Sequence, residues 1–164
     1  MCKAKKHYQT NIQKGTNMVK APEFTAVDET GKKHSLAEYK GKKVVLYFYP
    51  KDFTPGCTKQ ACSMKNDYAQ YQKNNIVILG INYDTSESHA KFKKEYSLPF
   101  NLLTDADHSI AKAYSANGGF TGFLGYPQRK TYLIDESGML VHTIDDVDIA
   151  TQAHDILKGF GIQK

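Results

Sequence analysis

Two of the three cysteines in the chain lie five residues apart in the segment PKDFTPGCTKQAC, which spans residues 50–62. Cys57 directly follows a Thr-Pro-Gly turn, after which the sequence takes on a helical pattern. Cys57 would therefore lie in the first turn of a helix, where unpaired backbone N–H groups and the helix dipole favour negative charge. Such a position favours the nucleophilic thiolate, although a buried and inert cysteine would suit it equally well.

The helix expected after the turn runs from Thr58 to Lys73, because apolar side chains recur there every three or four residues and so share one face. That face carries Cys57, Ala61, Met64, Tyr68 and Tyr71. Before the turn, the apolar run VVLYFYP over residues 44–50 is typical of a buried strand. Cys57 thus begins the core-facing stripe at the point where the chain leaves a central strand.

The rest of the sequence predicts further strands and helices that would position this segment. A short strand, a turn at 29–32 and a brief helix at 35–39 come first. Later segments predict strands at 76–84 and 101–105, helices at 87–96 and 105–114, two strands within 130–144 joined by a turn, and a helix at 150–160. This order predicts an α/β thioredoxin-like sandwich, with a central mixed β-sheet flanked by helices.

The 164 residues are enough for one domain with a sizeable core. We expect residues 1–20 to be a flexible basic extension, because they carry five lysines and no acidic residue, and residues 21–164 to be the charge-neutral folded domain. No apolar run is long enough to cross a bilayer and no secretory signal is evident, so we expect a cytoplasmic protein. In such a reducing compartment, a spaced cysteine pair is more typical of catalysis or metal binding than of a disulfide framework.

Pro50, Thr54 and Cys57 form the pattern P-x-x-x-T-x-x-C, the active-site motif of the peroxiredoxins. The sequence resembles a peroxiredoxin, and it is most similar to the Q-type branch, also called bacterioferritin comigratory protein. The segments LGINYD, PFNLLTDADHSIAKAY and RKTYLIDESG extend the likeness over residues 21–160. The resemblance implies a thioredoxin-like fold, a thiol-dependent peroxidase for hydrogen peroxide and organic hydroperoxides, and no metal or organic cofactor. It also implies thioredoxin or a similar dithiol as reductant. We further expect no specific nucleic acid or membrane partner, and a monomer or weak dimer.

The family mechanism gives each matched residue a role. Cys57 would be the peroxidatic nucleophile, which attacks the nearer peroxide oxygen and becomes a sulfenic acid. Thr54 would offer its hydroxyl to the thiolate and the peroxide, and Pro50 would shape the pocket. The family arginine corresponds to Arg129, the only arginine among 22 basic residues. Its planar fork of donors would stabilise the thiolate and the charge that moves onto the peroxide oxygens.

Cys62 matches the resolving cysteine of the Q-type branch. On an ideal helix, two Cα atoms five residues apart are separated by about 8.7 Å, whereas a disulfide requires less than about 7 Å. A Cys57–Cys62 disulfide would therefore require the first turns of the helix to unwind. The spacing suits a switch between a folded, peroxide-reactive state and a locally unfolded, disulfide-bonded state, although Cys62 would also suit the core as a small packing residue.

Four other interpretations of the sequence are weaker. A disulfide oxidoreductase of the thioredoxin type would normally carry C-x-x-C at this helix start, and a nucleic-acid-binding module would depend on the basic extension alone. A zinc site would need more ligands than this cysteine pair supplies. The glycine-rich segment 115–128 follows a helix rather than a strand, so it predicts a mobile loop and not a dinucleotide site. Its apolar residues Phe120, Phe123, Leu124 and Tyr126 would form a wall beside Arg129.

Overall fold

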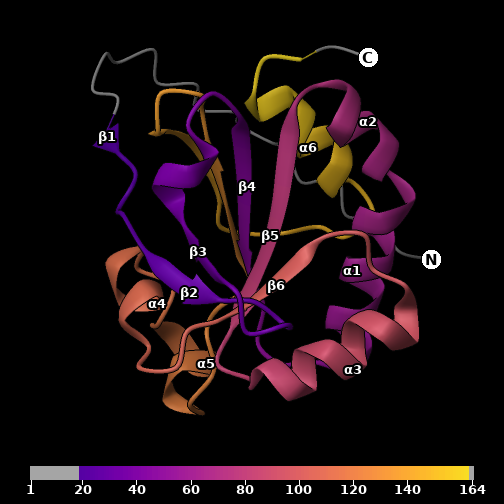
Figure 1. Cartoon of the computed structure of the whole chain (residues 1–164), viewed down its shortest axis with the longest axis vertical. Coiled ribbons are helices and arrows are strands. Elements are labelled where there is room, and N and C mark those ends of the chain that lie inside the picture. Colours follow the sequence, from indigo (N-terminus) through magenta and orange to yellow (C-terminus); the bar gives the residue numbers. More distant parts are fainter. Residues whose placement is uncertain (1–18, 163–164) are drawn as a thin grey trace, which may run out of the picture.

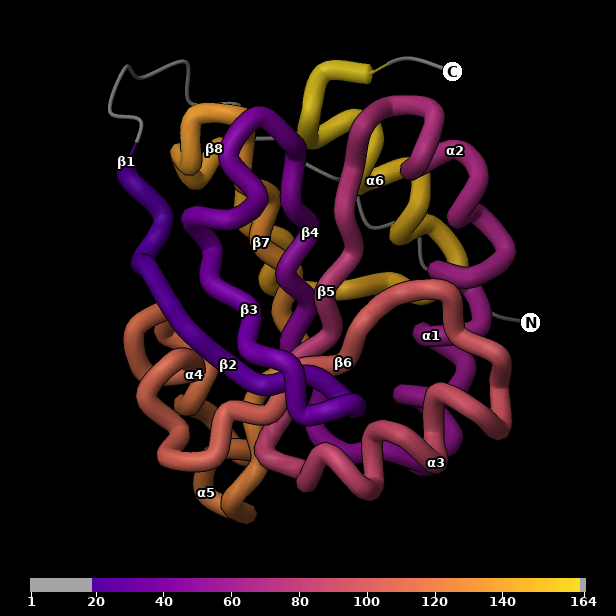
Figure 2. The backbone as a smooth tube through the Cα atoms, in the orientation of Figure 1, coloured from indigo at the N-terminus to yellow at the C-terminus, as the bar shows by residue number. Residues whose placement is uncertain are grey.

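Strand β4 (Lys43–Phe48) lies in the middle of the sheet that organises the protein (Figures 1 and 2). A computed structural model describes residues 19–162, and within them eight strands form one sheet in the order β1-β8-β7-β4-β5-β6-β2-β3. β4, β5 and β6 are mutually parallel, whereas the remaining neighbours pair antiparallel. The sheet is therefore mixed, and its apolar parallel strands occupy the centre, as their burial on both faces requires.

The bounds of the elements follow the sequence pattern closely. The other strands are β1 (Val19–Lys20), β2 (Thr25–Val27), β3 (Lys33–Ser35), β5 (Ile76–Asn82), β6 (Asn101–Thr104), β7 (Lys130–Ile134) and β8 (Met139–Ile144). The helices are α1 (Pro55–Asn66), α2 (Tyr68–Lys73), α3 (Ser86–Tyr96), α4 (Ser109–Ala113), α5 (Gly119–Phe123) and α6 (Gln152–Gly159), with the 3-10 helix η1 (Leu36–Tyr39). None of the helices described within residues 19–162 is long and apolar enough to cross a membrane.

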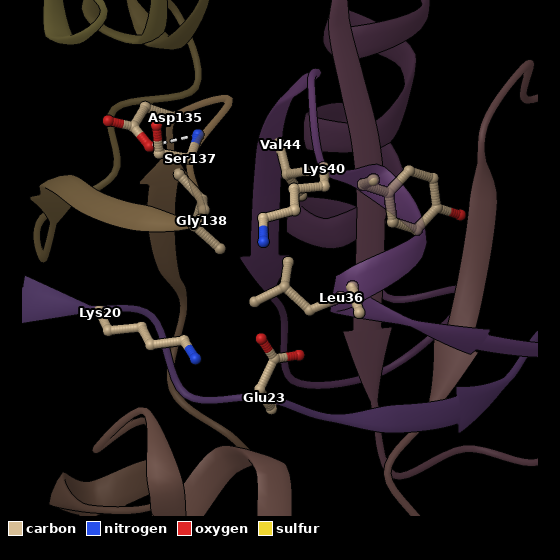
Figure 3. A pocket seen from close by; sticks show the side chains of 11 residues that line it. Lys20, Glu23, Leu36, Lys40, Val44, Asp135, Ser137 and Gly138 are labelled. Atoms are coloured by element: carbon tan, nitrogen blue, oxygen red, sulfur yellow. Dashed lines mark hydrogen bonds between the residues drawn. The ribbon is translucent and has the colours of Figure 1, made fainter.

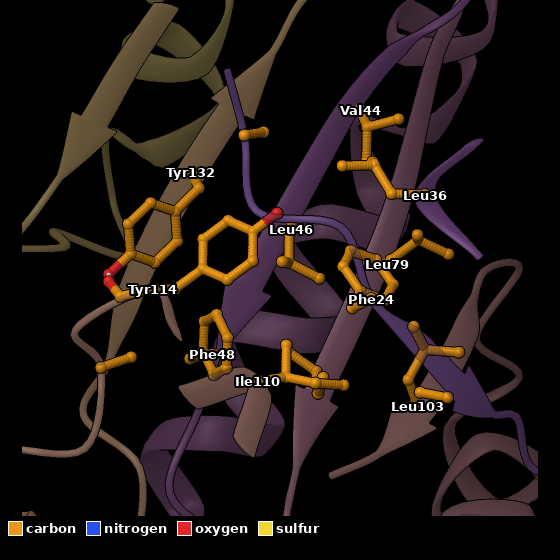
Figure 4. Close-up of a cluster of buried hydrophobic side chains, with 14 of the residues drawn as sticks. Phe24, Leu36, Val44, Leu46, Phe48, Leu79, Leu103, Ile110, Tyr114 and Tyr132 are labelled. Atoms are coloured by element: carbon orange, nitrogen blue, oxygen red, sulfur yellow. The ribbon is translucent and has the colours of Figure 1, made fainter. Parts of the chain in front are cut away.

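Alternate side chains of β4 enter two different cores. Val44, Leu46 and Phe48 pack into the cluster that Figure 4 shows, together with residues of β5, β7 and α4. Val45 and Tyr47 point to the opposite face, where they pack with residues of α1, α3 and α6. Because successive side chains of a strand point to opposite faces, one apolar strand anchors both layers of helices. Burial of each large apolar side chain stabilises the fold by about 1.5–3 kcal/mol.

Four details differ from the sequence prediction. The helix expected over 105–114 is confined to α4, Ser109–Ala113, with His108 as its N-cap residue. The single helix expected over 58–73 is two helices, which meet at Asp67 (φ −96°, ψ 5°), a residue type that favours helix ends over helix interiors. The glycine-rich segment contains the short helix α5, where Gly122 is required because a Cβ would lie 2.2 Å from the carbonyl oxygen of Asn117. Val19 and Lys20 form β1, so the sheet includes two residues assigned to the extension. The rest of that extension, residues 1–18 with Cys2, lies outside the described residues.

The hairpin of β2 and β3 holds a buried pair of titratable groups. The carboxylate of Asp28 lies 2.6 Å from Nε2 of His34, and both side chains are 5% exposed. The other carboxylate oxygen accepts hydrogen bonds from Thr30 and from the backbone N–H of Lys32. Burial raises the pKa of Asp28, but the hydrogen bonds outweigh it and lower the pKa to about 2. The ionised carboxylate therefore stabilises the hairpin.

We expect the pair of Asp28 and His34 to make the free energy of unfolding depend on pH in the acidic range. A carboxyl group with a folded-state pKa near 2 and an ordinary value of 3.8 stabilises the fold fully above about pH 4 and loses that contribution as the pH falls toward 2. The free energy of unfolding, measured by urea titration, should therefore decrease across this range. Asp28→Asn should be less stable than wild type at pH 7 and should show a shallower decrease between pH 4 and 2. Parallel pH profiles of the two proteins would contradict this assignment.

Candidate active site

The pairing of β4 with β7 brings the distant parts of the site together. Phe48, the last residue of β4, lies opposite Lys130, the first residue of β7. Arg129 directly precedes β7, so it lies beside the turn by which the chain leaves β4 and enters α1. Cys57 and Arg129, which are 72 positions apart in the sequence, thereby meet at one end of the sheet.

Cys57 is the third residue of α1 and its side chain is almost fully buried, with 2% exposed. Thr54 is the N-cap residue of the helix and Pro55 occupies its first position, where a missing N–H has no cost. Nη2 of Arg129 donates a hydrogen bond to the sulfur of Cys57 over 3.2 Å. The guanidinium and the first-turn N–H groups both favour negative charge at this sulfur, so the site suits a thiolate.

Gly56 provides room for this contact. A Cβ added to Gly56 would lie 3.3 Å from Nη2 of Arg129, closer than most real Cβ contacts. The absence of a side chain lets the guanidinium approach the first turn of α1. The glycine of the Thr-Pro-Gly turn is therefore explained by the arginine as well as by the turn.

Gln60 holds the arginine from the other side, and it was not among the site residues expected from the sequence. Nη1 of Arg129 donates to Oε1 of Gln60, which is fully buried one helical turn after Cys57. The backbone carbonyl of Gln60 in turn accepts a hydrogen bond of 3.1 Å from Gln152 of α6. The sequence does carry one signal for Gln60, since it is a polar residue on the apolar face of α1, three positions after Cys57. The contact from Gln152 has no local signal, because 92 residues separate the two glutamines.

Thr54 and Pro50 lie in the loop before α1. The hydroxyl of Thr54 donates its proton to the carbonyl oxygen of Lys51 over 2.9 Å. A hydroxyl has one proton, so in this arrangement Thr54 can only accept a hydrogen bond from a substrate and does not donate to the sulfur. Pro50 is half-buried and follows β4 by two residues.

Cys62 lies in the same helix as Cys57 but does not join the cluster around the sulfur. Both cysteines within the described residues are free thiols, Cys57 buried and Cys62 half-buried. Because α1 is helical from Pro55 to Asn66, the ideal spacing of about 8.7 Å between the two Cα atoms applies. The expected helix across the pair is confirmed, whereas the unwinding expected before a disulfide forms stays a prediction.

The cavity that Figure 3 shows lies apart from this cluster. The cavity of Figure 3, about 70 Å³, is lined by η1, the start of β4 and the turn before β8, and by none of the residues around Cys57. Phe120, Phe123 and Leu124 are exposed by 76%, 86% and 52%, and the apolar wall expected beside Arg129 stays a prediction. Tyr126 is half-buried, and Nζ of Lys51 lies 5.9 Å from its ring centre.

Among residues 19–162, no three acidic, histidine or cysteine side chains lie close enough together to hold a metal ion.

Comparison with known proteins defines the class. The model of the AhpC/TSA family matches residues 18–143. A putative peroxiredoxin bcp of Coxiella burnetii is 45% identical over 125 residues, which cover 74% of this chain and 82% of that protein. Chloroplastic peroxiredoxin Q of Sedum lineare is 44% identical over 119 residues, 73% of this chain and 63% of that protein. The chain thus spans less than two thirds of the length of this and several other plant relatives.

Solved structures agree with the sequence relatives. Peroxidoxin BcpB from Mycobacterium tuberculosis superposes with a TM-score of 0.80 at 27% identity, over 90% of this chain and 97% of that one. A cysteine-to-serine mutant of peroxiredoxin Q from Xanthomonas campestris gives a TM-score of 0.77 at 26% identity, over 84% of this chain and 90% of that one. The chain belongs to the AhpC/TSA family, in its peroxiredoxin Q (bcp) branch. The predicted thioredoxin-like sandwich is confirmed.

Proposed function

We propose that the chain is a thiol peroxidase that reduces hydrogen peroxide and organic hydroperoxides at Cys57. The observation that carries this proposal is the buried sulfur of Cys57 in the first turn of α1, 3.2 Å from the guanidinium of Arg129. The membership of the peroxiredoxin Q branch supports the same chemistry. A disulfide oxidoreductase does not require an arginine against its nucleophile, and the charge-neutral body has no net charge to attract nucleic acid.

In the proposed first step, the Cys57 thiolate attacks the nearer oxygen of the hydroperoxide and the O–O bond breaks. The attacked oxygen stays on the sulfur and its proton passes to the other oxygen, which leaves as water or an alcohol, and the sulfenate then takes up a proton from solvent water to become the sulfenic acid. Arg129 faces the sulfur and stabilises the charge that moves onto the peroxide oxygens. Gln60 fixes the orientation of Arg129, and Thr54 accepts a hydrogen bond from the bound peroxide.

In the proposed second step, the thiol of Cys62 attacks the sulfenic sulfur, a disulfide forms and water leaves. The first turns of α1 unwind to allow this bond. A dithiol reductant of the thioredoxin type then donates two electrons and two protons, which restores both thiols. The oligomeric state, monomer or weak dimer, and the cytoplasmic location stay predictions.

The function is tested by peroxide consumption in the presence of thioredoxin and its reductase. One equivalent of hydrogen peroxide should convert the reduced chain into a product two mass units lighter, with Cys57 and Cys62 both blocked. Turnover should require the thioredoxin system. A chain that consumes no peroxide but reduces a protein disulfide would be an oxidoreductase instead. Salt-dependent binding to DNA in place of either activity would favour the nucleic-acid alternative.

Arg129→Lys should slow the oxidation of Cys57 by roughly tenfold or more, although it preserves the charge. A lysine presents a point charge and cannot donate to Gln60 and the sulfur through a planar fork. A tenfold decrease corresponds to about 1.4 kcal/mol of lost transition-state stabilisation. Rapid mixing with peroxide, quenching by thiol alkylation and mass spectrometry measure the rate. A wild-type rate in this variant would exclude Arg129 from the chemistry.

A further inference from the structure

The loop between β4 and α1 contains a residue in an unusual backbone conformation. Phe53 has φ +64°, in the left-handed region that residues other than glycine rarely adopt. It directly precedes Thr54, the N-cap residue of α1, so its conformation sets where the helix begins. The ring of Phe53 is 47% exposed and packs edge-on against Phe92 of α3, with 5.1 Å between ring centres. Such a conformation persists only where the surroundings impose it.

The residue before it, Asp52, is tied to three other parts of the fold. Its side chain is almost fully buried, and one carboxylate oxygen accepts hydrogen bonds from the hydroxyl of Tyr49 (2.6 Å) and the amide of Asn82 (3.3 Å). The other oxygen accepts from the hydroxyl of Ser88 (2.8 Å) and lies 2.7 Å from Nδ1 of His89. Its backbone N–H donates to the carboxylate of Asp84 over 2.8 Å. The loop is thus fixed to the end of β5 and to the first turn of α3.

His89 has an acceptor at each ring nitrogen. Nδ1 faces the carboxylate of Asp52, and Nε2 lies 3.0 Å from the carbonyl oxygen of Leu103 in β6. Each ring nitrogen of His89 therefore lies within hydrogen-bond distance of an oxygen acceptor from another part of the fold. Burial raises the pKa of Asp52, but the hydrogen bond and charge of His89 outweigh it and lower that pKa. The contact between His89 and the Asp52 carboxylate joins side chains that are 0% and 1% exposed.

We propose that Asp52 and His89 are positioning residues, which hold the loop before α1 so that Cys57 stays in the helix and beside Arg129. The pair touches neither the sulfur nor the guanidinium, so it acts through the loop. This inference rests on the proposed function for its effect on peroxide, whereas its effect on the accessibility of Cys57 does not. The contact between Asp52 and His89 stabilises the folded, peroxide-reactive state, in which helix α1 is intact around Cys57.

The position of the pair argues for a role beyond stability. Buried ion pairs contribute little net stability compared with apolar side chains, because desolvation costs as much as the attraction returns. The contacts of Asp52 with Asp84, Ser88 and His89 instead fix the position of the loop relative to the end of β5 and the start of α3.

The test compares Asp52→Asn and His89→Gln with Asp28→Asn. The control removes the charge of another buried aspartate–histidine pair, whose hydrogen bonds all lie within residues 28–39. Two rates are measured for each reduced protein well below its unfolding temperature: oxidation of Cys57 by hydrogen peroxide and alkylation of Cys57 by iodoacetamide. Quenched-flow mass spectrometry with peptide mapping reports both.

We expect the two rates to change in opposite directions in Asp52→Asn and His89→Gln. Oxidation by peroxide should slow at least tenfold because Cys57 leaves its place beside Arg129. Alkylation should become severalfold faster because the buried sulfur becomes accessible. Asp28→Asn should lower the unfolding temperature but leave both rates at the wild-type values. A general loss of stability cannot produce this divergence.

Ser88→Ala keeps the proposal testable if the two stronger variants fail to fold, since Ser88 is only half-buried and supplies one of the four contacts to the carboxylate. It should show the same opposite changes, at least twofold each. Wild-type rates in all folded variants, rates that change together, or equal changes in Asp28→Asn would overturn the proposal. A wild-type Cys57 that does not react with peroxide would refute the proposed function, while the alkylation rates would still test the positioning role.

Discussion

Replacement of Cys57 by serine is expected to abolish peroxide turnover. The serine hydroxyl would remain protonated beside Arg129, and oxygen lacks the reactivity of a thiolate toward the O–O bond. The substitution is nearly isosteric, so α1 and the hydrogen bond from Arg129 should persist. Peroxide consumption coupled to thioredoxin and its reductase measures the loss, which should reach the rate without enzyme.

The control for this variant is its fold. Cys57→Ser should retain the wild-type circular dichroism spectrum and unfold at a temperature close to that of wild type, because the helix and its packing do not depend on the sulfur. More than a trace of thioredoxin-linked activity in a folded Cys57→Ser protein would show that another group is the nucleophile.

Replacement of Cys62 by serine should stop the cycle after one turnover. The variant should reduce one equivalent of peroxide per chain at the wild-type rate and then retain Cys57 as a sulfenic acid or a more oxidised form. No intrachain disulfide can form, so thioredoxin would have no such bond to reduce. Intact mass after one equivalent should increase by one oxygen in this variant, whereas wild type loses two hydrogens.

Hydrogen exchange tests the unwinding that this step requires. Amides between Thr58 and Ser63 should exchange faster in oxidised wild type than in the reduced form, because helix α1 spans both cysteines and cannot remain intact across the disulfide. A peptide map that links Cys57 to Cys2 or to another chain, with Cys62 free, would make Cys62 a packing residue. Equal protection in both redox states would show that the bond forms without loss of the helix.

The elements whose patterns are local could be predicted from the sequence. Continuous apolar runs predict the strands β4 and β5, and both strands form where those runs lie. Cys57 at the start of a helix followed from the Thr-Pro-Gly turn. Its contact with Arg129 came from the family resemblance alone, since no spacing rule relates residues so far apart.

The parts that could not be predicted depend on contacts across the sheet. Gln60 and His89 are polar residues on otherwise apolar helix faces, and their partners come from other elements. The break at Asp67 and the short helix α5 depend on small free-energy differences between similar backbone conformations. Tertiary packing, rather than local propensity, decides between them. No local pattern marks His89 as a partner of the loop before Cys57, because it contacts Asp52 across 37 positions of the sequence.

The pairing of β1 with β8 has a consequence for shortened forms of the chain. Val19 and Lys20 lie opposite Leu140 and Met139 and cover that part of the outer edge of β8. A chain that begins at Ala21 would leave the backbone groups of these residues unpaired, and an uncovered strand edge is a template for pairing with another molecule. Such a shortened protein should retain the site around Cys57 but self-associate through its sheet edge at high concentration.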